Sequence, residues 1–264
     1  MSFNTQNCKN FITQKLDYDV MAEAIRKCNA DIIGLNEMCD EGTGAPYEAQ
    51  TKILAEKLGY PYYYFAVASI FRGVNPFGNA LISKYPIIST EIVSIPIPEV
   101  RGYAGYYEDR CLLKAVVDVE GTKLNVLSIH FGLNQDEAEN AVKAVMANLP
   151  GENTVLMGDF NLTPDSPLLR PIRERMFDTA ELFAEDDKIA DETRSAAPIF
   201  TNEEIMQKIK EAAVPANAKL SFPSDAPRVK IDYIFTSPDV KVLCADIPAI
   251  VASDHRPHTA TIKL

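Results

Sequence analysis

Several short apolar segments of this chain end in a carboxylate, an amide or an imidazole, and this recurring pattern constrains the fold more than any other feature. In the clearest case, an apolar strand expected at residues 155–157 ends in Gly158-Asp159-Phe160-Asn161. On an extended backbone Asp159 and Asn161 would share one face, while Phe160 packs on the other and Gly158 allows close backbone approach. Such a strand end suits a hard cation, or a water molecule held against a substrate oxygen. An Asx turn closing a surface loop is the alternative.

Two N-terminal segments follow the same pattern. The strand expected at residues 1–5 ends at Asn4, and the apolar strand at residues 30–37 ends at Glu37. A strand-end residue on the surface is the alternative interpretation of Glu37.

The C-terminal part adds an acid and an imidazole. Asp232 lies inside the apolar strand expected at residues 229–235, where an unpaired carboxylate would be costly. It therefore needs a partner, and a histidine is the natural one. Asp254 and His255 follow in a loop between two strands, and a satisfied polar turn is the alternative there.

Residues 110–119 and 124–130 are expected to form a β-hairpin, with a turn at Gly121-Thr122. Arg110 opens the first strand and His130 closes the second, so antiparallel pairing would bring them to the same end. A solvated arginine and a satisfied core histidine are the alternatives for these two residues.

Helices are expected at residues 19–28 with Asp19 as the cap, at 46–58 with Pro46 in the first turn, and at 134–149. Shorter helices are expected at 167–175 and 202–212, and the acidic run 185–187 is expected to be a solvated loop.

The composition allows a large core. Of 264 residues, 47% are hydrophobic, enough for one domain over residues 1–264 if two sheets pack together. The longest apolar runs are too short to span a bilayer. The five cysteines are odd in number and widely spaced, which favours reduced thiols and a cytoplasmic location. No signal peptide is expected in the sequence as written, and the alternative is a secreted protein whose upstream signal has been removed.

The charge balance bears on the substrate. With 37 acidic and 26 basic residues, the formal charge is −11. A long polyanion such as duplex DNA would be repelled overall, and no cluster of Lys and Arg offers a phosphate track. A small phosphoester approaching a local cation fits this balance better, and nucleic acid is disfavoured. We expect a monomer.

Taken together, the ordered motifs resemble the endonuclease/exonuclease/phosphatase superfamily. The resemblance covers nearly the whole chain and rests on Ser2-Phe3-Asn4, Ile33-Gly34-Leu35-Asn36-Glu37, residues 78–87, Arg110, Ser128-Ile129-His130, Gly158-Asp159-Phe160-Asn161, Ile231-Asp232-Tyr233-Ile234 and residues 253–257. It implies an α/β fold, a four-layer α/β-β/α sandwich of two mainly antiparallel sheets flanked by helices, with a divalent-metal site on one rim.

The resemblance also implies roles for the motif residues. Glu37 would be the primary Mg²⁺ ligand, with Asn4 and Asp254 beside it, and Mn²⁺ could replace Mg²⁺. Asp159 and Asn161 would hold the attacking water and the phosphate. His255, oriented by Asp232, would act on the scissile phosphate as a base or as a charge stabiliser, and His130 and Arg110 would bind or protonate phosphate oxygens. An oxygen-rich site of this kind selects Mg²⁺ or Mn²⁺.

The sequence departs from the superfamily pattern at two points, of which the first is minor and the second bears on the substrate. Asn36 stands where many relatives have Gln before the glutamate, and the string that continues from Gly158 into Leu-Thr-Pro-Asp-Ser-Pro looks like the phosphatase and phosphodiesterase branches. The sequence therefore predicts a metal-dependent hydrolase of small phosphodiesters or phosphomonoesters, such as lipid or sugar head groups. The alternatives are a DNA nuclease of the same fold and a non-catalytic binding module. Specificity is expected to lie in the loops 38–46, 69–77, 99–109 and 185–225.

Overall fold

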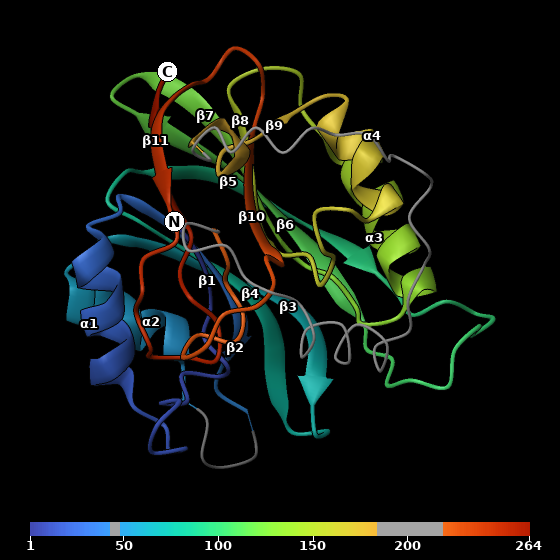
Figure 1. Ribbon diagram of the computed structural model, residues 1–264. Helices are drawn as coiled ribbons and strands as arrows, with labels where there is room; N and C mark the ends of the chain where they lie inside the picture. Colours follow the sequence, from blue (N-terminus) through green and yellow to red (C-terminus); the bar gives the residue numbers. More distant parts are fainter. Residues whose placement is uncertain (43–47, 184–218) are drawn as a thin grey trace.

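The computed structural model describes residues 1–42, 48–183 and 219–264, and two large sheets form its centre (Figure 1). The four-stranded sheet has the order β1-β2-β4-β3, and only its β1–β2 pair is parallel. Its strands are β1 (Ser2–Asn4), β2 (Ile32–Cys39), β3 (Tyr62–Phe71) and β4 (Asn75–Ser83).

The six-stranded sheet has the order β5-β6-β7-β8-β10-β9, and its one parallel pair is β7–β8. Its strands are β5 (Ile87–Ile95), β6 (Arg110–Val119), β7 (Thr122–His130), β8 (Thr154–Asp159), β9 (Phe177–Asp178) and β10 (Asp232–Thr236). A separate two-stranded sheet pairs β11 (Lys241–Asp246) with β12 (Thr259–Lys263). The predicted hairpin of β6 and β7 is confirmed.

Helices cover the outer face of each large sheet (Figure 1). The helices α1 (Tyr18–Cys28) and α2 (Gln50–Leu58) pack on the four-stranded sheet, and α3 (Gln135–Asn148) and α4 (Arg170–Arg173) pack on the six-stranded one. Short 3₁₀ turns lie at η1 (Pro167–Leu169) and η2 (Glu181–Phe183). The predicted four-layer sandwich of helices, sheet, sheet and helices is therefore the observed architecture. In the described part of the chain, no helix combines the length and apolar character needed to cross a bilayer.

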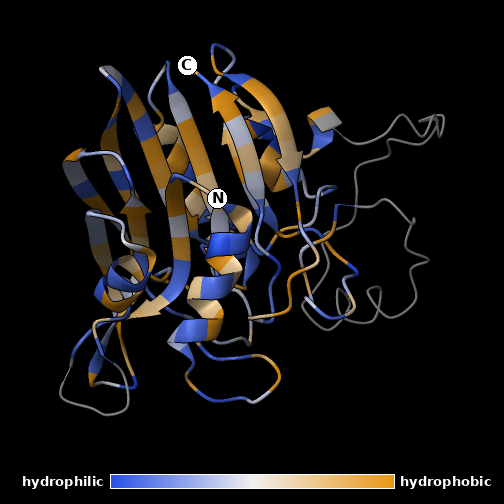
Figure 2. Ribbon diagram, turned by 90° about the vertical axis from the view of Figure 1, so that its left-hand side faces the viewer, coloured by the Kyte–Doolittle hydropathy of each residue, from blue (hydrophilic) through white to orange (hydrophobic). Residues whose placement is uncertain are grey.

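Three apolar layers follow from the alternation of side chains along the strands, which is visible as alternating colours in Figure 2. One layer lies under α1 and α2 and includes Phe3, Ile33 and Leu35. A second lies under α3 and includes Phe131 and Phe160. The third joins the inner faces of the two sheets, with Leu81, Leu113, Val126 and Met157 among its members. Burial on both faces explains why a central strand such as β8 begins with a nearly continuous apolar run.

Two predicted helix starts were wrong. The cap of α1 is Asp17, whose side chain accepts a hydrogen bond of 3.1 Å from the backbone of Val20, because Asp17 rather than Asp19 has the non-helical backbone of a cap. Asp19 lies instead in the first turn, where its charge favours the helix dipole. Helix α2 begins at Gln50, and Pro46 lies outside the described residues. The helix expected at 202–212 and the acidic run 185–187 also lie outside them.

Candidate active site

Three polar side chains lie next to one another at one end of the six-stranded sheet. His130 ends β7 and Asp159 ends β8, and the two are register partners. Asp232 begins β10 and is the register partner of Asp159 on its other side. All three are at most 5% exposed. The strand register alone therefore places an imidazole and two carboxylates at one rim of the sandwich.

The four-stranded sheet brings Asn4 and Glu37 to the same rim. Asn4 ends β1, and Glu37 lies where the pairing of β2 with β4 is interrupted. The prediction that the strand ends at Glu37 was wrong, because β2 continues to Cys39 through a β-bulge in which Glu37 has a φ of 53°. The bulge lets a charged side chain leave an otherwise buried strand.

Asn4 connects the acids of the two sheets. Its Nδ2 donates hydrogen bonds of 3.0 Å to Oε1 of Glu37 and of 3.0 Å to Oδ2 of Asp159, while its Oδ1 accepts one from the backbone of Gln6. In this orientation Asn4 is a donor to both carboxylates. To ligate a cation with its oxygen, the amide would have to turn by half a rotation.

His255 lies between two carboxylates. Its Nδ1 is 2.8 Å from Oδ2 of Asp232, and its Nε2 is 3.6 Å from Oδ2 of Asp159. The ring of Phe222 packs against the imidazole, with 4.8 Å between ring centroids. Burial alone would lower the pKa of His255, but the charges of Asp232 and Asp159 outweigh burial and raise it above the ordinary value. His255 is therefore an imidazolium at neutral pH. The predicted partnership of Asp232 with a histidine is found.

The opposite shift occurs at His130. Burial lowers its pKa well below 6.5, and the positive charge of Arg110 lowers it further. Nη1 of Arg110 lies 3.0 Å from Nδ1 of His130. A guanidinium can only donate, so Nδ1 is the acceptor and the single proton of the neutral ring is on Nε2. That N–H faces the rim, where Nε2 is 3.6 Å from Oδ2 of Asp159.

Asn161 also lies beside Asp159 and His130, although its backbone is not extended. Its φ is 49°, and its backbone N–H donates to Oδ1 of Asp159 at 2.9 Å. Its Nδ2 donates to the backbone oxygen of Phe131 at 3.1 Å. The approach of 3.2 Å between Asn161 Nδ2 and His130 Nε2 is not a hydrogen bond, because both atoms carry hydrogens. An Asx-type turn and a shared face therefore coexist at Asp159 and Asn161.

Gly158 makes this strand end possible. A Cβ at this position would lie 1.8 Å from the backbone oxygen of Ile129, and the residue has a φ of 150°. The expected close backbone approach is confirmed. Phe160 is fully buried and packs 4.6 Å from Phe131 between ring centroids, on the side away from the rim.

The acids of the rim fit a divalent cation. Burial raises the pKa of Glu37; the hydrogen bond from Asn4 opposes that rise, and the negative charge of Asp254 adds to it. Burial likewise raises the pKa of Asp159. Asp159, Asp232 and His255 also lie close together, with potential ligand atoms within 4.8 Å of one another, but the imidazolium cannot ligate a cation, so only the carboxylates are candidate ligands. Because carboxylates gathered in a buried rim repel one another, a hard cation would relieve them, and the oxygen-rich set suits Mg²⁺ or Mn²⁺.

Sequence reasoning missed two residues that organise this rim. Glu108 forms an ion pair of 3.0 Å with Arg110. Asn79 accepts a hydrogen bond of 2.8 Å from the side chain of Asn36 and donates one of 2.9 Å to the backbone of Cys111. For Asn79 a signal existed, since a polar side chain inside an apolar strand must find partners. For Glu108 in a polar loop there was none.

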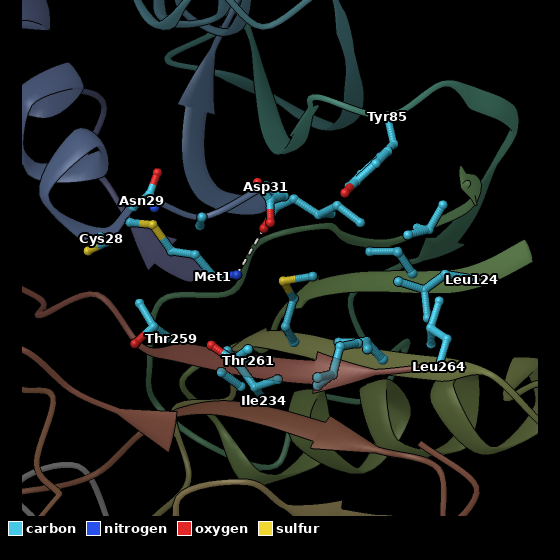
Figure 3. Close-up of a pocket in the computed structure, with 18 of the residues that line it drawn as sticks. Met1, Cys28, Asn29, Asp31, Tyr85, Leu124, Ile234, Thr259, Thr261 and Leu264 are labelled. Carbon is cyan, nitrogen blue, oxygen red and sulfur yellow. Dashed lines mark hydrogen bonds between the residues drawn. The ribbon is translucent and has the colours of Figure 1, made fainter. Parts of the chain in front are cut away.

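The large cavity in Figure 3 is a separate feature. It has a volume of about 470 Å³, and Ile32, Leu124 and Val155 are among the residues that line it. These residues lie near the starts of β2, β7 and β8, whereas Glu37, His130 and Asp159 lie near their far ends. None of the predicted site residues lines this cavity.

The comparisons with known proteins concern the family and the fold of the chain. The model of the Endonuclease/Exonuclease/phosphatase family matches residues 1–255. A search of the curated proteins finds no match. Among solved structures, the endonuclease/exonuclease/phosphatase from Beutenbergia cavernae DSM 12333 is 20% identical with a TM-score of 0.71, over 100% of this chain and 70% of that one.

Two further structures have the same fold. The mannosyl-6-phosphatase from Bacteroides thetaiotaomicron VPI-5482 is 15% identical with a TM-score of 0.67, over 100% of this chain and 98% of that one. TDP2 from D. rerio, solved with a single-strand DNA product, is 16% identical with a TM-score of 0.61, over 100% of this chain and 97% of that one. With a family model that spans nearly its full length, the chain belongs to the endonuclease/exonuclease/phosphatase family, whose members hydrolyse phosphoesters.

Proposed function

We propose that this protein is a divalent-metal-dependent hydrolase of small phosphomonoesters or phosphodiesters, acting by in-line attack of water on phosphorus. One observation carries the proposal. Oδ2 of Asp159 in one sheet lies 3.0 Å from the amide of Asn4 in the other and 3.6 Å from the Nε2 atoms of both His130 and His255. Acids, amides and imidazoles from both ends of the chain thus share one rim.

Glu37 and Asp254 are the proposed cation ligands, with Asn4 beside them as the residue that joins Glu37 to Asp159. Mg²⁺ is the proposed cation and Mn²⁺ a substitute. When bound, the cation neutralises negative charge that develops on the phosphoryl oxygens.

Asp159 and Asn161 are the proposed residues for the attacking water. Burial raises the pKa of Asp159, which moves this carboxylate toward the range of an effective base. The backbone N–H of Asn161 holds the other oxygen of Asp159 and so fixes its orientation.

The two histidines have different proposed roles. His255 is charged, because Asp232 and Asp159 raise its pKa, and this supports charge stabilisation at the phosphate rather than a role as base. His130 is neutral with its proton on Nε2, so it would bind a phosphate oxygen as a donor rather than protonate it as an imidazolium. Arg110 would contribute its positive charge from behind His130.

A phosphatase or phosphodiesterase role is favoured over a nuclease role. The net charge of −11 disfavours a long polyanion. One structural neighbour is a mannosyl-6-phosphatase, which supports a sugar phosphate as one substrate to test. Another neighbour was solved with a DNA product, so single-stranded DNA belongs in the same panel.

The test is a panel of phosphoesters with added Mg²⁺ or Mn²⁺. We expect turnover of phenyl phosphate or of a chromogenic phosphodiester, loss of that turnover in EDTA and its recovery with Mg²⁺. The variants His255→Ala and Asp159→Asn should lose about 100-fold or more in kcat/KM, since positioned acid, base and charge-stabilising groups typically contribute that much.

The matched control is Asp165→Asn, which removes an exposed carboxylate just beyond Asn161 in the same segment. It should keep nearly full activity. A loss of less than about tenfold in His255→Ala and Asp159→Asn would contradict the assigned roles.

Nicking of supercoiled plasmid at physiological salt, if it is lost in both variants, would favour the nuclease. Ligand binding without turnover of any phosphoester would favour a binding module.

A further inference from the structure

Arg110 is a buried cation at the rim, and its guanidinium already contacts a histidine and a carboxylate. Its Nη1 lies 3.0 Å from Nδ1 of His130 and 3.0 Å from Oε2 of Glu108. The Nε of Arg110 is buried without a hydrogen-bond partner among the described residues. Nη1 thus contacts both His130 and Glu108, and Glu108 offsets the charge of the guanidinium.

Glu108 is held firmly, unlike most loop carboxylates. Its side chain is only 11% exposed. Its backbone N–H donates a hydrogen bond of 3.1 Å to Oε1 of Glu137, which is itself buried and completes the capping box of α3 with Asn134. The carboxylate of Glu108 thus has a fixed place beside Arg110.

The second oxygen of Glu108 faces hydroxyl groups. Oε1 accepts a hydrogen bond of 3.3 Å from the hydroxyl of Tyr106 and one of 3.4 Å from that of Ser69. Both bonds are longer than a typical O–H···O bond. A hydroxyl of a bound substrate could replace either partner at little cost and form a shorter bond to the charged acceptor. Tyr106 is 67% exposed, so its ring can yield to a ligand.

The electrostatics of this position exclude some substrates. A second phosphate or carboxylate on the substrate would meet Glu108 beside a guanidinium that Glu108 already offsets. Like-charge contacts of this kind oppose binding.

We propose that Glu108 determines specificity: it accepts a hydroxyl from a neutral, polyhydroxylated alcohol part of the substrate and rejects substrates with a second anionic group. This inference rests on the proposed function, because it concerns the alcohol that the phosphoester carries. Glu108 comes from the loop 99–109, in which specificity was expected, whereas Ser69 lies in β3, because most of the expected loop 69–77 is part of the β3–β4 hairpin.

The experiment compares three substrates. Glucose 6-phosphate carries hydroxyls and no second anion, glucose 1,6-bisphosphate adds a second phosphate, and phenyl phosphate has neither. For each substrate, kcat/KM is measured with Mg²⁺ for the unmodified protein, for Glu108→Gln, and for Glu99→Gln, which removes an exposed carboxylate from the same loop.

Relative to phenyl phosphate, Glu108→Gln should raise kcat/KM for the bisphosphate about tenfold and lower it for glucose 6-phosphate about threefold, since a like-charge contact is lost and a charged acceptor becomes neutral. Glu99→Gln should change neither ratio. Ratios in Glu108→Gln within about twofold of those of the unmodified protein would overturn the proposal.

A second measurement needs no substitution. In the unmodified protein, the preference for glucose 6-phosphate over the bisphosphate should weaken as ionic strength rises, because salt screens the repulsion. A preference independent of salt would count against a charge-based selection. If the unmodified protein turns over none of the three substrates and also fails to cleave the chromogenic phosphodiester, the proposed function fails and this inference fails with it. Turnover of phenyl phosphate or of the chromogenic phosphodiester without the expected preference overturns this inference alone.

Discussion

The backbone N–H of Asp159 donates a hydrogen bond of 3.0 Å to Oδ1 of Asn36, which ties the strand that carries Asp159 in one sheet to the strand that carries Glu37 in the other. The amide nitrogen of Asn36 donates in turn to Oδ1 of Asn79 at 2.8 Å and to the backbone oxygen of Ile129 at 3.0 Å. Asn36 is fully buried and every bond is made within the protein. This amide therefore sets the spacing of the two acids of the rim.

We predict that Asn36→Leu lowers the free energy of unfolding by about 3 kcal/mol, because an isosteric apolar side chain leaves three buried polar groups without partners. Urea unfolding measures this loss. The control Asn125→Leu, in which a half-buried asparagine loses one bond to the backbone of Glu152, should cost less than about 1 kcal/mol. If Asn36 positions the acids, the folded fraction of Asn36→Leu will also bind Mn²⁺ more weakly in calorimetry. Unchanged Mn²⁺ affinity would limit Asn36 to a structural role.

Much of the rim could be predicted because local patterns fixed it. Apolar runs with polar ends defined β1 and β8, and the hairpin pattern predicted that Arg110 and His130 lie at the same end. Apolar runs also located β2 and β10, although β2 continues past Glu37 and β10 begins at Asp232, which was expected inside the strand. The partnership of Asp232 with a histidine followed from the cost of a buried unpaired carboxylate. These inferences need only strand periodicity and the requirement that buried polar groups be satisfied.

The remaining features depend on contacts between segments that the sequence does not order. The bulge at Glu37 arises from the pairing of β2 with β4, and the amide orientation of Asn4 depends on Gln6 and on both sheets. The pairing of Glu108 with Arg110 depends on how the loop folds against α3. Such features are set by tertiary packing, so residue type and spacing alone could not predict them.

The contact between Asp232 and His255 leads to a prediction about charge. Asp232→Asn keeps the shape of the side chain but removes the charge that helps to raise the pKa of His255. The pKa of the imidazole should then fall toward its ordinary value, and kcat should decline at a lower pH than in the unmodified protein. We expect a loss of about 100-fold or more in kcat at neutral pH. A pH–rate profile of both proteins measures the shift, and an unchanged alkaline limb would contradict the role of His255 as an imidazolium.

The contact between Arg110 and His130 leads to a prediction about the imidazole tautomer. Because the guanidinium only donates, His130 should be protonated on Nε2 alone in the unmodified protein. Arg110→Met should release this constraint and yield a mixture of tautomers, which ¹⁵N NMR of the histidine side chains can resolve. The exposed Arg175 provides the control, and Arg175→Met should leave the spectrum of His130 unchanged. A proton on Nδ1 in the unmodified protein would refute the assignment.

His258 leads to a prediction about stability at low pH. It is fully buried, its Nε2 lies 3.3 Å from Oγ1 of Thr179, and its backbone pairs with Ser2. Burial lowers its pKa well below 6.5, and the positive charge of Lys230 lowers it further. The unfolded chain therefore takes up a proton below about pH 6.5 that the folded protein does not. The stability that neutral His258 contributes is complete above pH 6.5 and is lost as the pH falls toward the folded pKa.

His258→Gln removes this proton uptake. Urea unfolding between pH 5.0 and 7.5 should then show a pH dependence of the unfolding free energy that is shallower by up to about 1.4 kcal/mol per pH unit below pH 6.5, the value for one proton. His130 has a pKa shift of the same sign, but it is present in both proteins and cancels in the difference. Equal slopes in the two proteins would mean that His258 is protonated in the folded state, and burial would then not be what governs its charge.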